Sequence, residues 1–229
     1  MPIEEMVKLA KKYHPKATIM VDGAHAPGIL DLNMRDLSSI GVDYYTGNLH
    51  KWCYAPKGSA FLWTSPLKKE NKEFRNIAPT VISSTGQASY TGRFAYTGTR
   101  DYTSFCAIPA ALDFCDELGG STTIYKRNHE LIIEGAKLCA KKWGTYLLAP
   151  EKNYGVMVDV LFPSDIKKFE KVHLRLKNED DIYFIGKECD VGGEKRVITR
   201  LSSNVYLDLS DFENLANKAW QYLSECSDD

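Results

Sequence analysis

The chain has 229 residues, of which 44% are apolar, so it can bury a sizeable core and fold as one or two domains. Its 29 basic and 30 acidic residues leave a net charge of −1, which argues against nucleic acid or an anionic membrane surface as a partner. No apolar run approaches the roughly 20 residues that a membrane-spanning helix needs.

Cysteine usage indicates a reducing compartment. The six cysteines lie far apart without paired spacing, which favours free thiols over a disulfide framework or a zinc site. The opening residues lack the basic start and apolar stretch of a secretory signal. We therefore expect a cytoplasmic protein without a metal site.

The first half of the chain alternates helical and strand-like segments. The expected elements are a helix over 3–13, strands over 18–22, 42–46 and 58–63, and a short helix within 29–40 that Asp36 caps. The strand–helix–strand order predicts that the first two strands pair in parallel, and the tight link to the third allows antiparallel pairing. Asp22 ends a strand that reads as buried, at the edge where α/β folds bind ligands.

The second half predicts a separate α+β lobe. Periodicity is lost over 65–100, and an irregular segment of this length is usually functional or disordered; we favour a functional loop. The elements expected after it are helices over 103–118, 121–142, 164–176 and 210–223, and strands over 156–162, 182–185 and 196–201 in a small antiparallel sheet. We therefore predict one domain over 1–120 and a small α+β domain over 121–229.

Lys51 is the candidate nucleophile. It lies between His50 and Trp52, where an apolar run gives way to turn residues. An amine between two rings can be partly desolvated, which favours the neutral form that attacks a carbonyl carbon. The alternative is a loop lysine whose ammonium group lies in water.

Four sequence blocks carry a resemblance to a known family. They are Asp22-Gly-Ala-His25, the His50-Lys51 pair after a strand, Tyr96-Thr-Gly-Thr-Arg-Asp-Tyr102, and Arg200-Leu-Ser-Ser-Asn-Val-Tyr206. Together and in this order they resemble the class V aminotransferase family of pyridoxal-phosphate enzymes. The chain is most similar to the isopenicillin N epimerase and plant-type cysteine desulfhydrase branch, from about Ala17 to near Gln221.

The resemblance implies pyridoxal 5′-phosphate as cofactor and a role for each matching residue. Lys51 matches the lysine that forms the imine with the cofactor and serves as the catalytic base. Asp22 matches the carboxylate that pairs with the ring nitrogen, although a strand-end aspartate can also cap the turn that follows it. His25 matches the residue that contacts the phenolic oxygen, and His50 matches a donor to the phosphate.

Two further residues are implied by the resemblance. Thr99 matches a threonine that reaches the phosphate of the partner subunit, which implies a homodimer with shared active sites. Arg200 matches the residue that binds the substrate carboxylate through a two-pronged guanidinium contact, although a surface arginine at a strand is the simpler interpretation. The implied substrate is a small amino acid, and the implied reaction is epimerisation, cysteine desulfhydration (a lyase reaction) or amino transfer.

The resemblance also has a gap. Relatives carry a large part of the cofactor domain ahead of the segment that matches Ala17, including a glycine- and threonine-rich phosphate site, and residues 1–16 cannot supply it. We therefore expect an N-terminally truncated α/β protein, the C-terminal part of a fold type I pyridoxal-phosphate-dependent transferase: an incomplete large α/β domain and a small α+β domain. The alternative function is a catalytically incomplete homologue or fragment that serves as a dimerisation or binding module.

Overall fold

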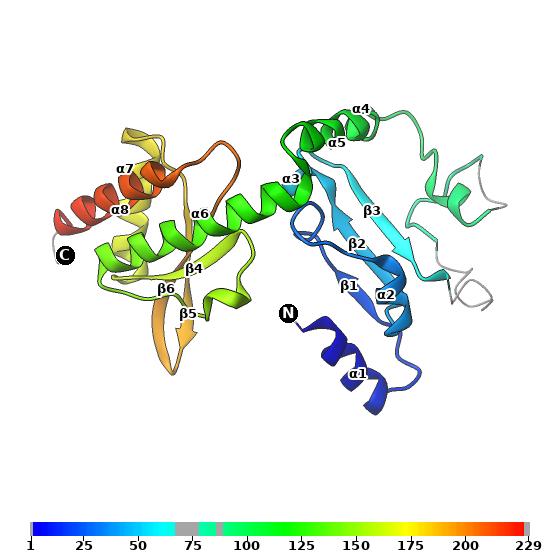
Figure 1. The fold of residues 1–229 in the computed structure, drawn as a ribbon, viewed down its shortest axis with the longest axis horizontal. Coiled ribbons are helices and arrows are strands. Elements are labelled where there is room, and N and C mark those ends of the chain that lie inside the picture. Colours follow the sequence, from blue (N-terminus) through cyan, green and yellow to red (C-terminus); the bar gives the residue numbers. More distant parts are fainter. Residues whose placement is uncertain (1, 67–77, 86–88, 227–229) are drawn as a thin grey trace. The chain divides into compact units, whose positions relative to one another are not determined.

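The computed structural model describes residues 2–66, 78–85 and 89–226. The chain divides into two compact units, Met1–Thr122 and Thr123–Asp229, each with its own sheet. The elements of each unit are labelled in Figure 1.

The first unit contains a three-stranded sheet in the order β1-β2-β3. Strand β1 is Met20–Asp22, β2 is Tyr44–Asn48 and β3 is Ala60–Thr64. The predicted pairing is confirmed, because β1 runs parallel to β2 and β3 runs antiparallel to it. In this register Asp22 pairs with Thr46, so both strands end at the same edge of the sheet.

The expectation that β1 is buried was wrong. Met20 is 59% exposed and Asp22 is exposed as well. The physical reason is that, among the described residues, β1 hydrogen-bonds to β2 alone and is therefore an edge strand. Apolar composition predicted a strand here but not its position in the sheet.

Two helices pack against this sheet. The predicted helix over 3–13 is confirmed as α1, Ile3–Tyr13, and α2 is Met34–Ser39. They form a core with the sheet through Val7, Leu37, Val42 and Tyr45. The N-cap of α2 is Asn33, whose side chain accepts from the Arg35 N–H at 3.0 Å, and not Asp36 as predicted, because the helix begins three residues earlier than that cap requires.

A buried carboxylate joins α1 to the sheet. Asp43 is fully buried just before β2, where its Oδ2 accepts from the Ile19 backbone N–H at 2.8 Å. The same oxygen lies 3.4 Å from the Lys11 ammonium group, which also donates to the Ala17 carbonyl at 2.5 Å. Asp43 thereby ties the helix, the approach to β1 and the start of β2 together, and its charge is paired as a buried charge requires.

The rest of the first unit is helical and irregular. Helix α3 is Leu49–Trp52, a 3₁₀ turn covers Thr91–Phe94, and the single helix predicted over 103–118 is two helices, α4 Thr103–Cys106 and α5 Ile108–Glu117. Pro109 explains the break, because proline is favoured in the first turn of a new helix. Of the irregular segment predicted over 65–100, residues 67–77 and 86–88 lie outside the described residues.

The second unit packs three helices on a small sheet. Its helices are α6 Gly120–Trp143, α7 Ile166–Glu179 and α8 Leu209–Ser224, and its strands are β4 Met157–Phe162, β5 Ile185–Val191 and β6 Glu194–Ser202, with a 3₁₀ turn at Glu151–Asn153. The strand order is β4-β6-β5 with both pairs antiparallel, which confirms the predicted antiparallel sheet.

The core of this unit is closely packed. Val158 and Val160 of β4 are fully buried against all three helices. Helix α6 approaches α8 at Gly135, where a Cβ atom would lie 2.4 Å from the Phe212 ring. A larger residue at position 135 would therefore separate these two helices.

The predicted strand over 182–185 was misplaced, because β5 begins at Ile185. Phe184 is buried in the core just before the strand. The strand itself pairs with β6 alone among the described residues and carries charged side chains, so its hydrophobic pattern is weak. The core contact of Phe184, and not the strand, produced the apolar signal.

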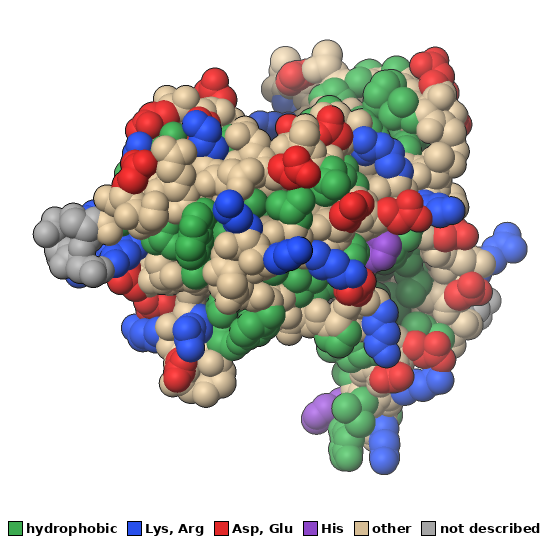
Figure 2. All heavy atoms as spheres, turned by 60° about the vertical axis from the view of Figure 1, so that its left-hand side comes forward, with side chains coloured by type: hydrophobic (Ala, Val, Ile, Leu, Met, Phe, Trp, Pro, Cys, Tyr) green, Lys and Arg blue, Asp and Glu red, His purple; other side chains and the backbone are tan. Residues whose placement is uncertain are grey.

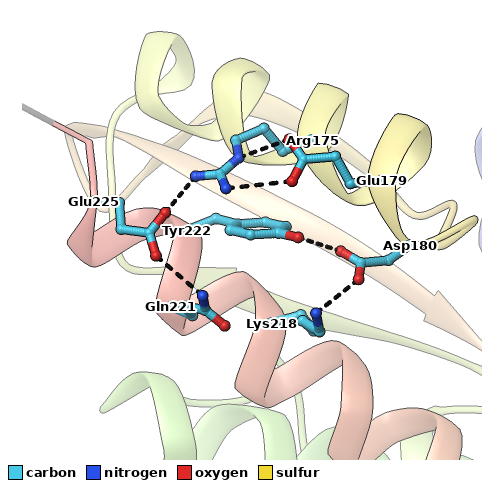
Figure 3. Close-up of polar contacts among 7 residues, drawn as sticks. All are labelled: Arg175, Glu179, Asp180, Lys218, Gln221, Tyr222 and Glu225. Carbon is cyan, nitrogen blue, oxygen red and sulfur yellow. Dashed lines mark hydrogen bonds and ion pairs between the residues drawn. The ribbon is translucent and has the colours of Figure 1, made fainter.

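A polar network on the surface joins α7 to α8 (Figure 3). The Arg175 guanidinium lies over the Tyr222 ring, 3.8 Å from its centroid, and donates to Glu179 at 3.0 Å and to Glu225 at 2.6 Å. The Tyr222 hydroxyl donates to Asp180 at 2.6 Å. Each exposed ion pair adds little to the free energy of folding. The main effect of the network is therefore to orient the end of α7 against α8.

The molecular surface carries both signs of charge. On the face shown in Figure 2, acidic and basic side chains are interspersed among polar and apolar ones. This agrees with the net charge of −1. Among the described residues, no helix is both long enough and apolar enough to cross a membrane.

Alkaline pH should weaken the second unit through Cys139. Burial raises the pKa of this thiol from 9.0 to about 12. The folded state therefore holds the proton more tightly than the unfolded state, so its contribution is complete below the unfolded pKa and is lost as pH rises through the folded one. We expect the free energy of unfolding to fall between about pH 9 and pH 12, and to fall less in Cys139→Ala.

Urea unfolding followed by circular dichroism across this pH range measures the effect. Cys106→Ala is the matched control, because Cys106 is exposed. The same pH slope in wild type and Cys139→Ala would contradict the assignment.

Candidate active site

The candidate site lies where β1 and β2 end. Backbone pairing continues one residue past β1, since the Gly23 N–H donates to the Thr46 carbonyl at 2.9 Å. The chain then turns, and the Ala26 N–H donates back to the Gly23 carbonyl. Asp22 Oδ1 accepts from the Ala24 N–H at 3.0 Å, so the carboxylate does cap this turn.

Helix α3 follows β2 directly and carries His50 and Lys51. Two donors converge on one acceptor here, because the Leu49 N–H and His50 Nδ1 both contact the Ser59 carbonyl, the latter at 2.9 Å. A carbonyl oxygen only accepts, so His50 carries a proton on Nδ1. The ring is thereby oriented by the segment that leads into β3.

Lys51 and His25 are in direct contact. Lys51 Nζ lies 3.0 Å from His25 Nε2, and both side chains are half-buried. The other ring nitrogen of His25, Nδ1, lies 3.4 Å from Trp52 Nε1. Residues 26 positions apart in the sequence thus meet in one constellation at the carboxyl end of the parallel pair.

Close backbone packing holds the turn after β1 in place. Gly28 has φ of +86°, and a Cβ atom there would lie 2.5 Å from the Trp52 carbonyl oxygen. Glycine is therefore required both for the left-handed conformation and for the close approach to α3. At Gly23 a Cβ atom would overlap the Tyr45 side chain.

Tyr45 is a site residue that the sequence analysis missed. It is fully buried beneath the turn and stacks on Phe61, with ring centroids 6.2 Å apart. Burial raises the pKa of its phenol, and the negative charge of Asp22 raises it further. The phenol therefore stays neutral beside the carboxylate. The sequence signal that could have identified Tyr45 is its position on β2, one residue before Thr46, which pairs with Asp22.

Thr99 and Arg200 are the two remaining predicted site residues. Thr99 is exposed, its hydroxyl lies 3.4 Å from that of Tyr96, and no contact among the described residues joins it to Lys51. Arg200 is exposed on β6 in the second unit, where it pairs in register with Asp159 of β4. Burial raises the pKa of Asp159, and the charge of Arg200 opposes this.

A cleft beside the sheet adjoins the site. Its volume is about 460 Å³, and it is lined by Thr46, Ala60, Phe61, Leu62, Tyr90, Thr91 and Phe94. Most of these side chains are apolar or aromatic. Across the part of the chain that the structure describes, no group of three or more His, Cys, Asp or Glu side chains could hold a metal ion.

The chain resembles curated proteins over part of their length. It is 32% identical to the probable L-cysteine desulfhydrase, chloroplastic, of Arabidopsis thaliana, in a match that covers 93% of this chain and 46% of that protein. It is 39% identical to the isopenicillin N epimerase of Streptomyces clavuligerus over 58% of this chain and 35% of that one. The chain is a homologue of L-cysteine desulfhydrases and isopenicillin N epimerase. The predicted resemblance is therefore confirmed.

The fold is shared with solved structures. A C-DES variant with glycine covalently linked to the PLP cofactor superimposes with a TM-score of 0.70 at 18% identity, covering 96% of this chain and 56% of that one. The predicted fold class, part of a fold type I enzyme, is confirmed. The chain spans about half the length of the desulfhydrase that it matches. No protein-family model matches the chain.

Gly23→Ala should destabilise the first unit. The added methyl group would overlap the buried Tyr45 ring, and overpacking of this kind costs about 1–3 kcal/mol. Denaturant unfolding of both single variants and of the double variant Gly23→Ala/Tyr45→Ala measures the coupling. We expect Gly23→Ala to cost much less once Tyr45 is shortened. Equal costs in the two backgrounds would remove the steric explanation.

Proposed function

We propose that this chain is part of a pyridoxal 5′-phosphate-dependent enzyme that acts on a small amino acid through Lys51. The observation that carries the proposal is the 3.0 Å contact between Lys51 Nζ and His25 Nε2 at the carboxyl end of β1 and β2. Homology to cysteine desulfhydrases supports it, and so does the fold shared with a PLP-linked structure.

The residues at this edge fit the cofactor chemically. Lys51 supplies the amine that attaches the cofactor, and Asp22 supplies a carboxylate for the ring nitrogen. His25 lies beside the amine and is proposed to contact the phenolic oxygen. His50 has Nδ1 held by the Ser59 carbonyl, so we assign Nε2 to the phosphate. When bound, the cofactor supplies an electron sink for charge that develops at the substrate α-carbon.

Proton transfer and substrate binding are assigned to residues of this chain. Lys51 is proposed as the base that removes and returns the proton at the substrate α-carbon. Arg200 is proposed to bind the substrate carboxylate in a bidentate contact, which fixes the direction of that C–H bond. The reaction class that we favour is elimination from cysteine or epimerisation, after the two groups of relatives, with amino transfer as a further possibility of the same site.

A second candidate function rests on one observation. The chain covers 46% of the desulfhydrase that it matches, so it can be a catalytically incomplete homologue that serves as a dimerisation or binding module. In that case Lys51 and His25 are retained without a bound cofactor. The two candidates differ in whether the purified protein binds pyridoxal 5′-phosphate.

Lys51→Ala should abolish attachment of the cofactor without unfolding the protein. The wild-type protein, mixed with pyridoxal 5′-phosphate, should absorb visible light, and borohydride should fix the label at Lys51. Lys57→Ala is the matched control, since Lys57 is an exposed lysine in the turn between α3 and β3. An unchanged absorbance in Lys51→Ala at matched circular dichroism would remove Lys51 from the site, and a colourless wild-type protein would favour the second candidate.

We also propose a homodimer with shared active sites and a cytoplasmic location. The exposure of Thr99 supports the first, because the residue is available to a partner subunit. The six free cysteines support a reducing compartment. The Arabidopsis relative is named as chloroplastic, so it does not support the cytoplasmic location that we propose for this chain.

Light scattering should give twice the mass of the chain at micromolar concentration. Thr99→Arg should lower the dimer fraction, because a charged side chain would be buried at the interface. Lys152→Arg is a control for a surface change, since Lys152 is an exposed residue of the second unit. A wild-type monomer at this concentration would contradict the dimer.

A further inference from the structure

Trp52 has a contact that the proposed chemistry does not use. Its indole is 92% buried and its Nε1 lies 3.4 Å from His25 Nδ1, while His25 Nε2 lies 3.0 Å from Lys51 Nζ. The two rings are tilted by 50° with centroids 6.3 Å apart, so the contact is made edge to edge and not by stacking. His25 is therefore contacted at both ring nitrogens by neighbours from one turn of α3.

The chemistry of the indole decides where His25 carries its proton. An indole N–H can only donate, so the nitrogen it faces must accept. The contact with Trp52 thus favours an unprotonated His25 Nδ1. A neutral imidazole has one N–H, and in this tautomer of His25 it lies on Nε2 and faces Lys51.

The same reasoning reaches the lysine. An ammonium group has three donors and no acceptor, so it cannot receive the His25 Nε2–H. Only the neutral amine of Lys51 accepts this hydrogen bond. In the opposite tautomer, with the proton on Nδ1, two N–H groups would face each other at Trp52, while Nε2 would accept from a charged Lys51.

We propose that Trp52 is a positioning residue that selects the Nε2–H tautomer of His25, so that this N–H faces the Lys51 amine. Its catalytic meaning rests on the proposed function, because the neutral amine is the form that attacks a carbonyl carbon. The tautomer itself is a property of the unliganded chain. It can therefore be tested whether or not the chain binds pyridoxal 5′-phosphate.

His50 provides an internal reference in the same experiment. Its Nδ1 faces the Ser59 carbonyl, so its neutral form carries the proton on Nδ1. His25 and His50 are thus expected in opposite tautomers, although they lie at one site. Nitrogen chemical shifts distinguish the two forms directly.

The first test is a ¹⁵N–¹H correlation spectrum of the histidine rings in the labelled chain. At about pH 8.5, above the ordinary imidazole range, neutral rings dominate. We expect an Nε2–H signal for His25, assigned by its loss in His25→Gln, and an Nδ1–H signal for His50. A proton on His25 Nδ1, or on both nitrogens, would overturn the proposal without any change to Trp52.

The second test removes the indole N–H and keeps an aromatic ring. In Trp52→Phe we expect a mixture of the two His25 tautomers, because the preference for the Nε2–H form should fall by roughly 2- to 10-fold, the effect of one hydrogen bond. Trp63→Phe is the matched control, since Trp63 is a partly buried indole on β3 of the same unit. An unchanged His25 tautomer in Trp52→Phe would show that Trp52 acts only in packing.

The outcomes separate this proposal from the proposed function. If His25 has the expected tautomer but the chain never binds pyridoxal 5′-phosphate, the function fails and the role of Trp52 stands. If the cofactor attaches to Lys51 and the His25 tautomer is the opposite one, the role of Trp52 fails and the function stands.

Discussion

The parallel pairing of β1 with β2 is the constraint on which the candidate site depends. Asp43 holds this pairing, because its buried carboxylate accepts from the Ile19 backbone and faces the Lys11 ammonium group. Asp22 is thereby opposite Thr46, and the two strands end together. A slip of one residue would turn every side chain of β1 to the other face of the sheet, and His25 would no longer meet Lys51.

Two short connections bring the candidate site residues together. The turn after β1 packs on α3 at Gly28, where no side chain fits. The segment between β2 and β3 holds His50 through the Ser59 carbonyl. A backbone carbonyl orients the His50 ring, whereas the side chains of Lys51 and Trp52 contact His25.

Most elements could be predicted from hydrophobic periodicity, and the errors have physical causes. The long helices α1, α6, α7 and α8 have clear apolar faces and were predicted within a few residues. Edge strands were predicted poorly: β1 reads as buried although Met20 is exposed, and β5 follows the apolar signal of Phe184 instead of coinciding with it. An edge strand buries fewer of its side chains than its composition suggests.

The sequence by itself determined the fold class, the parallel pair and the short list of chemically capable residues, because period, turn residues and motif order are local properties. Only the tertiary structure decided which of these residues meet. It brings His25 to Lys51 across 26 positions, assigns Trp52 to the second nitrogen of His25, and leaves Arg200 on a strand of the other unit. Such contacts depend on strand register and backbone turns, which couple residues far apart in the chain and leave no periodic signal in it.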